Sequence, residues 1–160
     1  MADLSGPPLV YIDANPFIYF VEGTPEIAEP VRCLFDLLRG RPGLGVTSEL
    51  SLAETLPKAP SERHRHSYLE LIVGSRIFDL VPVDRDLLLE TADYRRTNSS
   101  SDATGIRTMP KLPDAIHAVS AMRRKCRAFV SYDKRLKLPS GLRLFSPDTV
   151  SINELLKTIS

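Results

Sequence analysis

The stretch "LVYIDANPFIYF", residues 9–20, decides the fold because a short apolar run ends abruptly on a carboxylate. Leu9 to Ile12 have the length and the side chains of a buried strand, and Asp13 follows it directly. The next residues predict a short helix over 15–23, since Pro16 suits a first helical turn and Gly23 suits the end. In parallel α/β sheets, ligands bind at the carboxyl ends of strands. The sequence therefore places Asp13 where a functional site is expected.

Composition limits the classes of protein to consider. The chain has 160 residues, 42% of them hydrophobic and 26% charged, which predicts one globular domain spanning residues 1–160. Its net charge of +1 gives no global field that would indicate nucleic-acid or membrane binding. No apolar run approaches the roughly 20 residues of a membrane span, and the start "MADLSGPP" lacks the features of a signal peptide. Cys33 and Cys126 share no metal-ligand spacing, so we expect two free thiols. Together, these features predict a cytoplasmic protein that binds no membrane.

Strand and helix patterns alternate along the rest of the chain. Further strands are predicted at residues 44–47, 76–83, 127–132 and 142–147. Further helices are predicted at residues 24–43, 48–58, 61–75, 84–96, 114–125 and 151–160. Residues 98–113 are rich in Ser, Gly and Pro and are predicted to form an irregular loop. This alternation predicts an α/β fold, with three α/β/α layers and a central parallel sheet.

Four acids stand at or near the carboxyl ends of the predicted strands: Asp13, Glu54, Asp114 and Asp133. In a parallel sheet these places lie along one edge, so we expect the carboxylates to lie together. Two carboxylates about 4 Å apart repel by roughly 4 kcal/mol at an effective dielectric constant of about 20. Mg²⁺ or Mn²⁺ would remove this repulsion, lower the pKa of a bound water and neutralise charge on a phosphate. The acids therefore indicate a metal-dependent nuclease.

The segments around these acids also resemble a known family. "VYIDANPFIYF", "VTSELSLAE", "LPDAIHAVSA" and "FVSYDKRL" are similar to the signature blocks of PIN-domain ribonucleases, and in particular of VapC-type toxins from toxin–antitoxin pairs. The resemblance implies a PIN-like fold, Mg²⁺- or Mn²⁺-dependent cleavage of RNA, a homodimer and a small antitoxin partner. It matches Asp13, Glu54 and Asp114 to the core acids of the family, and Asp133 to a fourth, more variable acid.

Three polar residues complete the expected site. Asn15 stands where the family commonly has a small polar residue, and Ser131 stands where it often has a threonine. Ser48 is expected to cap the helix over 48–58. Ser48 and Ser131 are interpreted as caps or hydrogen-bond donors rather than nucleophiles, because no histidine–acid pair accompanies either one. Glu49 is interpreted as solvent-facing.

Each acid also has an ordinary structural interpretation. Asp114 would serve as a helix N-cap, Glu54 would be solvated on a helix surface, and Asp133 would begin a turn. His117, one turn after Asp114, would orient that carboxylate or simply pack in the core. The basic runs at 122–127 and 133–137 would stabilise the ends of their elements or contact phosphate. His64 and His66, two residues apart on a helix, face different directions and predict no zinc site.

Several other functions were weighed against the nuclease. A haloacid-type phosphatase needs a second aspartate where this chain has Asn15, and a phospho-receiver fits poorly because Asp84 lies beyond a proline. A catalytically inactive PIN-like module that binds RNA or protein, and a housekeeping RNA-processing nuclease, remain open alternatives. The homodimer has a physical motive too, since residues 16–23 and 68–73 carry more large apolar side chains than a small domain is expected to bury.

Overall fold

The computed structural model describes residues 6–160. Residues 1–5, which include part of the expected domain and of the stretch that lacks a signal-peptide pattern, lie outside the described residues. Five strands form one sheet: β1 (Val10–Ile12), β2 (Gly45–Ser48), β3 (Phe78–Val81), β6 (Ala128–Val130) and β7 (Arg143–Phe145). They are arranged in the order β3-β2-β1-β6-β7, and every neighbouring pair is parallel. The predicted central parallel sheet is confirmed.

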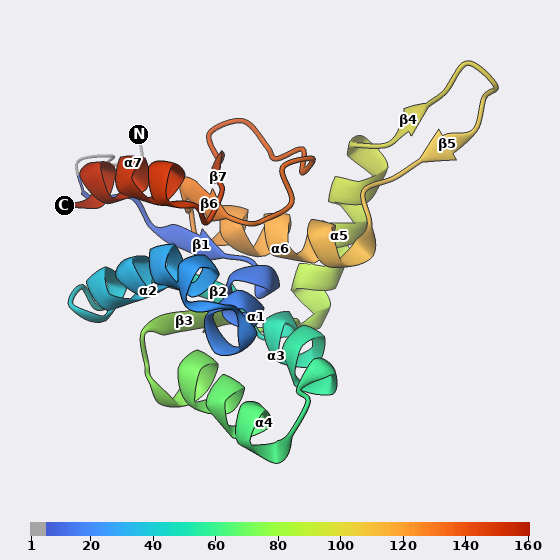
Figure 1. The fold of residues 1–160 in the computed structure, drawn as a ribbon. Helices are drawn as coiled ribbons and strands as arrows, with labels where there is room; N and C mark the ends of the chain where they lie inside the picture. The colour runs from blue at the N-terminus through green and yellow to red at the C-terminus, as the bar shows by residue number, and fades with distance from the viewer. Residues whose placement is uncertain (1–5) are drawn as a thin grey trace.

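Helices cover both faces of this sheet (Figure 1). Val10 and Ile12 of β1 pack with α1 (Ala14–Glu22), α2 (Pro25–Arg39), α4 (Glu62–Leu69) and α7 (Thr149–Ile159). Tyr11, which points to the opposite face, packs with α5 (Arg85–Thr97) and α6 (Leu112–Arg123). Successive side chains of a strand alternate between faces, so a fully apolar strand contributes to two separate cores. The three-layer α/β/α prediction is confirmed.

Three helices begin two residues away from the expected position, among them α7, which begins at Thr149 rather than Ser151. Ser48 remains the last residue of β2, so the following helix, α3 (Leu50–Thr55), begins later and continues as the 3₁₀ turn η1 (Leu56–Lys58). Helix α6 begins at Leu112, two residues before Asp114, because Pro113 is well accommodated in a first helical turn. The Leu-Pro pair that indicated a loop therefore belongs to the helix. Helix α4 continues as the π-helical turn η2 (Glu70–Gly74).

The prediction of an irregular loop over 98–113 is wrong. This segment forms an antiparallel hairpin of β4 (Ser100–Ser101) and β5 (Arg107–Thr108), which projects from the body beside the end of α5 (Figure 1). The Asp102 carboxylate holds the turn, because its Oδ1 accepts hydrogen bonds from the backbone N–H groups of Thr104 at 2.8 Å and Ile106 at 3.0 Å. Gly105 supplies the left-handed conformation that the turn needs, with φ of +81°. We call residues 98–111, between α5 and α6, the arm.

The apolar residues that motivated a homodimer are only partly buried within the chain itself. Phe17, Tyr68 and Ile72 are fully buried, while Tyr19 and Val73 are 36% and 44% exposed. The Tyr68 hydroxyl also donates a hydrogen bond to Glu22 of α1. The homodimer therefore stays a prediction. None of the helices within residues 6–160 is long and apolar enough to cross a membrane.

Candidate functional site

Asp13 lies between β1 and β6, where the chain order of the sheet reverses. Its backbone N–H donates to the carbonyl of Val130 at 3.0 Å, which continues the pairing of the two strands. Its carboxylate accepts hydrogen bonds from the N–H of Ala14 at 2.8 Å and from the hydroxyl of Ser131 at 2.7 Å. The acid that ends β1 thus caps α1 as well, and both of its oxygens are held in place.

Ser131, the buried residue directly after β6, links two of the acids. Its hydroxyl donates to Asp13, and its oxygen accepts a hydrogen bond from the N–H of Asp133 at 3.1 Å. Ser48 acts differently, because its oxygen accepts from the N–H of Leu50 at 3.0 Å and, within residues 6–160, forms no hydrogen bond with any of the four acids. The N-cap position of α3 is Glu49 rather than Ser48, and Glu49 is solvent-exposed as expected. Ser131 therefore reaches the candidate site, whereas Ser48 supports the start of α3.

His117 connects Glu54 to the strand-end acid. Its Nε2 lies 2.5 Å from Glu54 Oε1 and 3.4 Å from Asp13 Oδ1, and its Nδ1 lies 2.6 Å from the Tyr11 hydroxyl. The spacing in the sequence pointed to Asp114 as its partner, yet no hydrogen bond joins these two side chains in the described structure. The ring is fully buried, so it is a core residue that also orients a carboxylate. The helical spacing could not show that Glu54 of α3 packs across this ring.

The surrounding charges fix the proton on His117. An ionised carboxylate only accepts hydrogen bonds, so the Nε2 that contacts Glu54 must carry a proton. Burial lowers the pKa of His117, but the hydrogen bond to Glu54 and the charges of Asp13, Glu54 and Asp114 outweigh burial, and the pKa is raised above its ordinary 6.5. Burial, and secondly the charge of Asp13, raises the pKa of Tyr11 well above its ordinary value. Tyr11 thus remains a neutral phenol beside the ring.

Asp114 stands in the first turn of α6 and is partly buried. The N-cap of this helix is Lys111, so the interpretation of Asp114 as the N-cap is wrong. Burial is the main cause of a raised pKa at Asp114, and the charges of Asp13 and Asp133 raise it further. Its carboxylate has no hydrogen-bond partner among residues 6–160. Asp114 is therefore a partly buried carboxylate in the first turn of α6 that no hydrogen bond from residues 6–160 holds in place.

Asp133 begins a turn, as its ordinary interpretation predicted. Its Oδ1 accepts a hydrogen bond from the N–H of Arg135 at 3.0 Å and lies 3.4 Å from the Arg135 Nε. Asp133 also lines two neighbouring hollows, one shared with Asp114 and the other with Asn15 of α1. Both interpretations of Asp133 are compatible, because one carboxylate oxygen holds the turn while the residue borders the site.

The chemical type of the four acids, carboxylate oxygens, suits a hard divalent cation. Carboxylate oxygens are the ligands that Mg²⁺ and Mn²⁺ prefer, and the pKa of Asp114 is raised first by burial and then by the charges of Asp13 and Asp133, which a cation would offset. In residues 6–160, no three His, Cys, Asp or Glu side chains converge closely enough to hold one ion. Glu54 contacts His117 and Asp133 contacts Arg135, so neither carboxylate is free of a partner within these residues.

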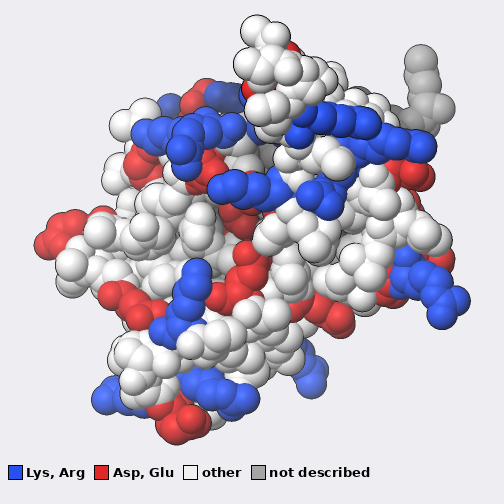
Figure 2. Space-filling model, turned by 90° about the vertical axis from the view of Figure 1, so that its right-hand side faces the viewer, with Lys and Arg blue, Asp and Glu red and all other residues white. Residues whose placement is uncertain are grey.

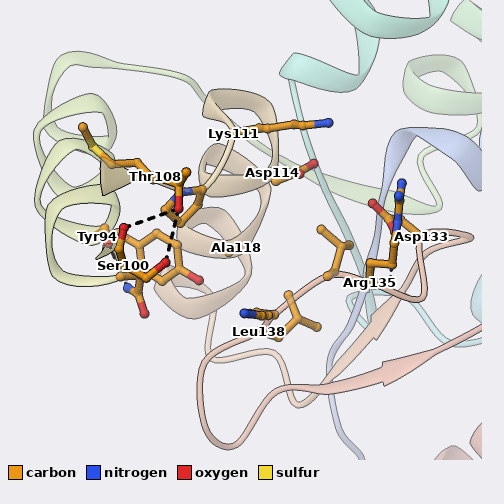
Figure 3. Close-up of a pocket in the computed structure, with 14 residues that line it drawn as sticks. Tyr94, Ser100, Thr108, Lys111, Asp114, Ala118, Asp133, Arg135 and Leu138 are labelled. Atoms are coloured by element: carbon orange, nitrogen blue, oxygen red, sulfur yellow. Dashed lines mark hydrogen bonds and ion pairs between the residues drawn. The ribbon is translucent and has the colours of Figure 1, made fainter. Parts of the chain in front are cut away.

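A pocket of about 420 Å³ adjoins the acids (Figure 3). Asp114 and Asp133 line one end of it, and Lys111, Arg135 and Lys137 contribute positive charge. On the face of the molecule shown in Figure 2, acidic side chains gather near the centre, with Lys and Arg side chains around them. A near-neutral chain thus presents an acidic centre with a basic rim, which suits a phosphate backbone bound at a metal site.

The other basic run, at residues 122–127, has mainly structural partners. Arg123 pairs with Glu90 at 2.7 Å, Arg124 pairs with Asp79, and Arg127 donates to the carbonyl of Gly6 at 2.7 Å. The structure thus favours the structural interpretation of this run over phosphate contact. His64 has a structural partner as well, since its Nδ1 lies 2.7 Å from the Ser61 hydroxyl that caps α4.

Comparison with known proteins gives a family. The family model of the PIN domain matches residues 10–141. The chain belongs to the PIN-domain family. This match includes all four acids, the pocket and the arm, and the family consists of nucleases in general. A search of curated proteins gives no match.

Solved structures share the fold of this PIN domain at low sequence identity. VapBC2 from Rickettsia felis, bound to a DNA fragment from its promoter, has a TM-score of 0.63 at 15% identity, covering 86% of this chain and 98% of that one. DNA-bound VapBC from Salmonella typhimurium has a TM-score of 0.60 at 20% identity, covering 88% and 98%. Mycobacterium tuberculosis VapC20, a sarcin–ricin loop cleaving toxin, has a TM-score of 0.58 at 12% identity, covering 79% and 91%.

Proposed function

We propose that this PIN domain is a metal-dependent endoribonuclease that hydrolyses RNA phosphodiester bonds, and that it is the toxin of a toxin–antitoxin pair. One observation carries the proposal. Asp13, Glu54 and Asp114 come from distant segments and gather where the chain order of the sheet reverses, beside a pocket with a basic rim. Membership of the PIN-domain family supports nuclease chemistry.

In this proposal the four acids hold a metal ion, and neighbouring groups orient two of them. Asp13, Asp114, Glu54 and Asp133 would hold Mg²⁺ or Mn²⁺, which supplies electrostatic stabilisation of charge on the phosphate and lowers the pKa of water. Ser131 and the N–H of Ala14 keep the Asp13 carboxylate oriented. His117 orients Glu54 through a hydrogen bond between the ring Nε2 and the carboxylate.

The substrate and partners follow from charge and from the relatives. Lys111, Arg135 and Lys137 are exposed at the pocket and would pair with phosphates of the RNA backbone. The relatives solved as VapBC complexes support a small antitoxin partner, and the sarcin–ricin loop cleaved by VapC20 supports an RNA substrate. The homodimer and the cytoplasmic location are parts of the same proposal, and the free thiols of Cys33 and Cys126 agree with a reducing compartment.

The test is cleavage of single-stranded and structured RNA by the purified chain with Mg²⁺, Mn²⁺ or excess EDTA. We expect cleavage with either metal and none with EDTA. Glu54→Gln should lose at least about 100-fold in rate, while Glu49→Gln, an equal change at an exposed position near the same helix, should cleave like the parent. Undiminished cleavage in EDTA would contradict the metal mechanism. RNA binding without cleavage under every condition would instead identify the inactive binding module.

A further inference from the structure

We propose that the pocket between the arm and α6 binds an unpaired nucleobase of the RNA and thereby places the neighbouring phosphate at the acids. The identity of this ligand rests on the proposed function. The pocket has a volume of about 420 Å³ and extends from Asp114 and Asp133 to the base of the arm. In Figure 3 the acids lie toward one side of the pocket, and Tyr94, Ser100 and Thr108 lie on the other. A ligand that fills the pocket therefore contacts the acids on one side and the residues at the base of the arm on the other.

The walls of the pocket combine apolar surface with positive charge. Tyr94 of α5, Met109 of the arm and Leu138 of the segment after β6 supply aromatic and aliphatic surface, on which a base can pack. Lys111 and Lys137 bring positive charge to the same cavity. Bases stack on aromatic surface while cations bind the backbone that carries them, so this combination is typical of single-stranded nucleic-acid sites.

The arm adds groups that can read the edge of a base. Ser100 and Thr108 face each other across β4 and β5, with 3.2 Å between their hydroxyl oxygens, and both line the pocket. Asn98 contributes an amide beside them. Hydroxyl and amide groups donate and accept hydrogen bonds, as base edges do. The two hydroxyls are bonded to each other at the surface, so exchange with a base edge leaves neither of them buried without a partner.

The base of the arm is hydrogen-bonded to α5 and the arm is cross-linked within itself, while its hairpin projects from the body. Arg95 Nε of α5 donates to the carbonyl of Pro110 at 2.9 Å, and Arg107 Nε donates to the Ser99 hydroxyl at 2.9 Å. The Asp102 turn then fixes the tip. A pocket wall that is already ordered loses less conformational entropy when a ligand binds. This favours affinity for a ligand as small as one nucleotide.

An RNA base fits this pocket better than a protein segment does. A peptide would have to bring its own positive charge to Asp114 and Asp133 while lying against Lys111 and Lys137. A nucleotide places its phosphate at the charged end and its base against the apolar walls. A paired base cannot enter, because its edge and both faces are occupied in the duplex. The inference therefore predicts selectivity for unpaired RNA.

The decisive experiment maps binding of nucleoside 5′-monophosphates by backbone NMR shifts of the full chain in EDTA, with ribose 5-phosphate as the base-free probe. We expect the monophosphates to shift amide signals of Tyr94, Met109 and Leu138, and to bind at least about tenfold more tightly than ribose 5-phosphate. Thr108→Glu should weaken this binding. Ile106→Glu, which makes the same charge change at the exposed tip outside the pocket lining, should not.

The outcomes separate this inference from the proposed function. Glu54→Gln should bind monophosphates like the parent, so base binding without RNA cleavage would contradict the nuclease and leave the pocket standing. Equal binding of monophosphates and ribose 5-phosphate, or shifts confined to Lys111 and Lys137, would overturn the base pocket even in an active nuclease. Equal affinity of Thr108→Glu and Ile106→Glu for the monophosphates would overturn it as well. A peptide segment of an antitoxin that shifts Tyr94, Met109 and Leu138 where monophosphates do not would also overturn it.

Discussion

The acidic site has two walls that differ in how firmly the fold holds them. The strand wall consists of Asp13, Ser131, His117 and Glu54, whose polar groups are joined by hydrogen bonds, and the first three are buried. The open wall consists of Asp114, Asp133 and the pocket residues beyond them. Asp114 has no hydrogen-bond partner in the described structure, and Asp133 is held through an exposed arginine. The fold thus fixes the side chains of the strand wall, whereas the side chains of the open wall remain available to a ligand.

This difference suggests a division of work. The parallel sheet brings the ends of β1 and β6 to one point, so the strand wall is set by the fold and suits chemistry that needs fixed geometry. The open wall depends on the start of α6 and on the arm. We expect changes on the strand wall to affect the rate of cleavage and the stability, and changes at the pocket residues of the open wall to affect substrate binding.

The largest effect is expected for Asp13→Asn. Asparagine caps helices about as well as aspartate, so the free energy of unfolding should change little through the cap. Cleavage should fall roughly 1000-fold, about 4 kcal/mol, because a fixed charge on the strand wall is lost. Rates of RNA cleavage with saturating Mg²⁺, together with melting curves, measure both. Asp133→Asn is the matched control on the open wall and should lose only about tenfold, so equal losses would remove the distinction between the walls.

The second effect concerns stability and is expected for His117→Leu. This change removes the buried Tyr11 hydroxyl's hydrogen bond to His117 and should cost about 1–3 kcal/mol in the free energy of unfolding. Freed from His117, Glu54 should also lose its orientation, and Mg²⁺ should stabilise the variant less than it stabilises the parent. Denaturant titrations with and without Mg²⁺ measure this. Adding Tyr11→Phe should recover part of the loss, and a double variant that loses the full sum would show that the hydrogen bond is not the cause.

The pH dependence of the metal-free protein sharpens this prediction. A raised pKa means that the folded state binds the proton more tightly than the unfolded state. The contribution of His117 is thus complete below its ordinary pKa of 6.5 and is lost as the pH rises through its raised value. The raised pKa of Asp114 acts in the same direction above 3.8. We expect the melting temperature in EDTA to fall as the pH rises above 6.5, and to fall less in His117→Leu. A steeper fall in the variant would contradict the assignment.

A smaller effect is expected for Ser131→Ala. Alanine removes the hydroxyl that donates to Asp13 and accepts from Asp133, at a cost of about 1 kcal/mol. Ser131→Thr keeps the hydroxyl and should remain close to the parent in both stability and cleavage. Thermal melts and cleavage rates of the two variants test whether the hydroxyl or merely the size of the side chain matters. A loss in Ser131→Thr as large as in Ser131→Ala would favour size.

The sequence predicted what depends on local pattern. The alternation of strand and helix patterns along the chain was sufficient for the parallel sheet, and the break of β1 at Asp13 marked one strand end at its edge. The contact of His117 with Glu54 joins residues 63 positions apart, and helical spacing carries no information about it. The arm was missed because Asp102 and Gly105 form its turn without apolar alternation on either side. The start of α6 was missed because a proline in a first turn looks the same as a proline in a loop.

The central claim is that the acids form a crowded site for a cation, and Asp114→Asn tests it most directly. Without metal, removing one charge should relieve repulsion, so the variant should melt at the same temperature as the parent or higher. The gain is of order 1 kcal/mol at most, because water screens this partly exposed group.

The measurement is a set of melting curves of the parent and Asp114→Asn, each with EDTA and with Mg²⁺. The account predicts that Mg²⁺ stabilises the parent by binding to the folded state, and that it stabilises the variant much less. If the variant melts well below the parent in EDTA, Asp114 supports the fold through an ordinary partner. If Mg²⁺ stabilises both proteins equally, Asp114 holds no cation and the central claim is wrong.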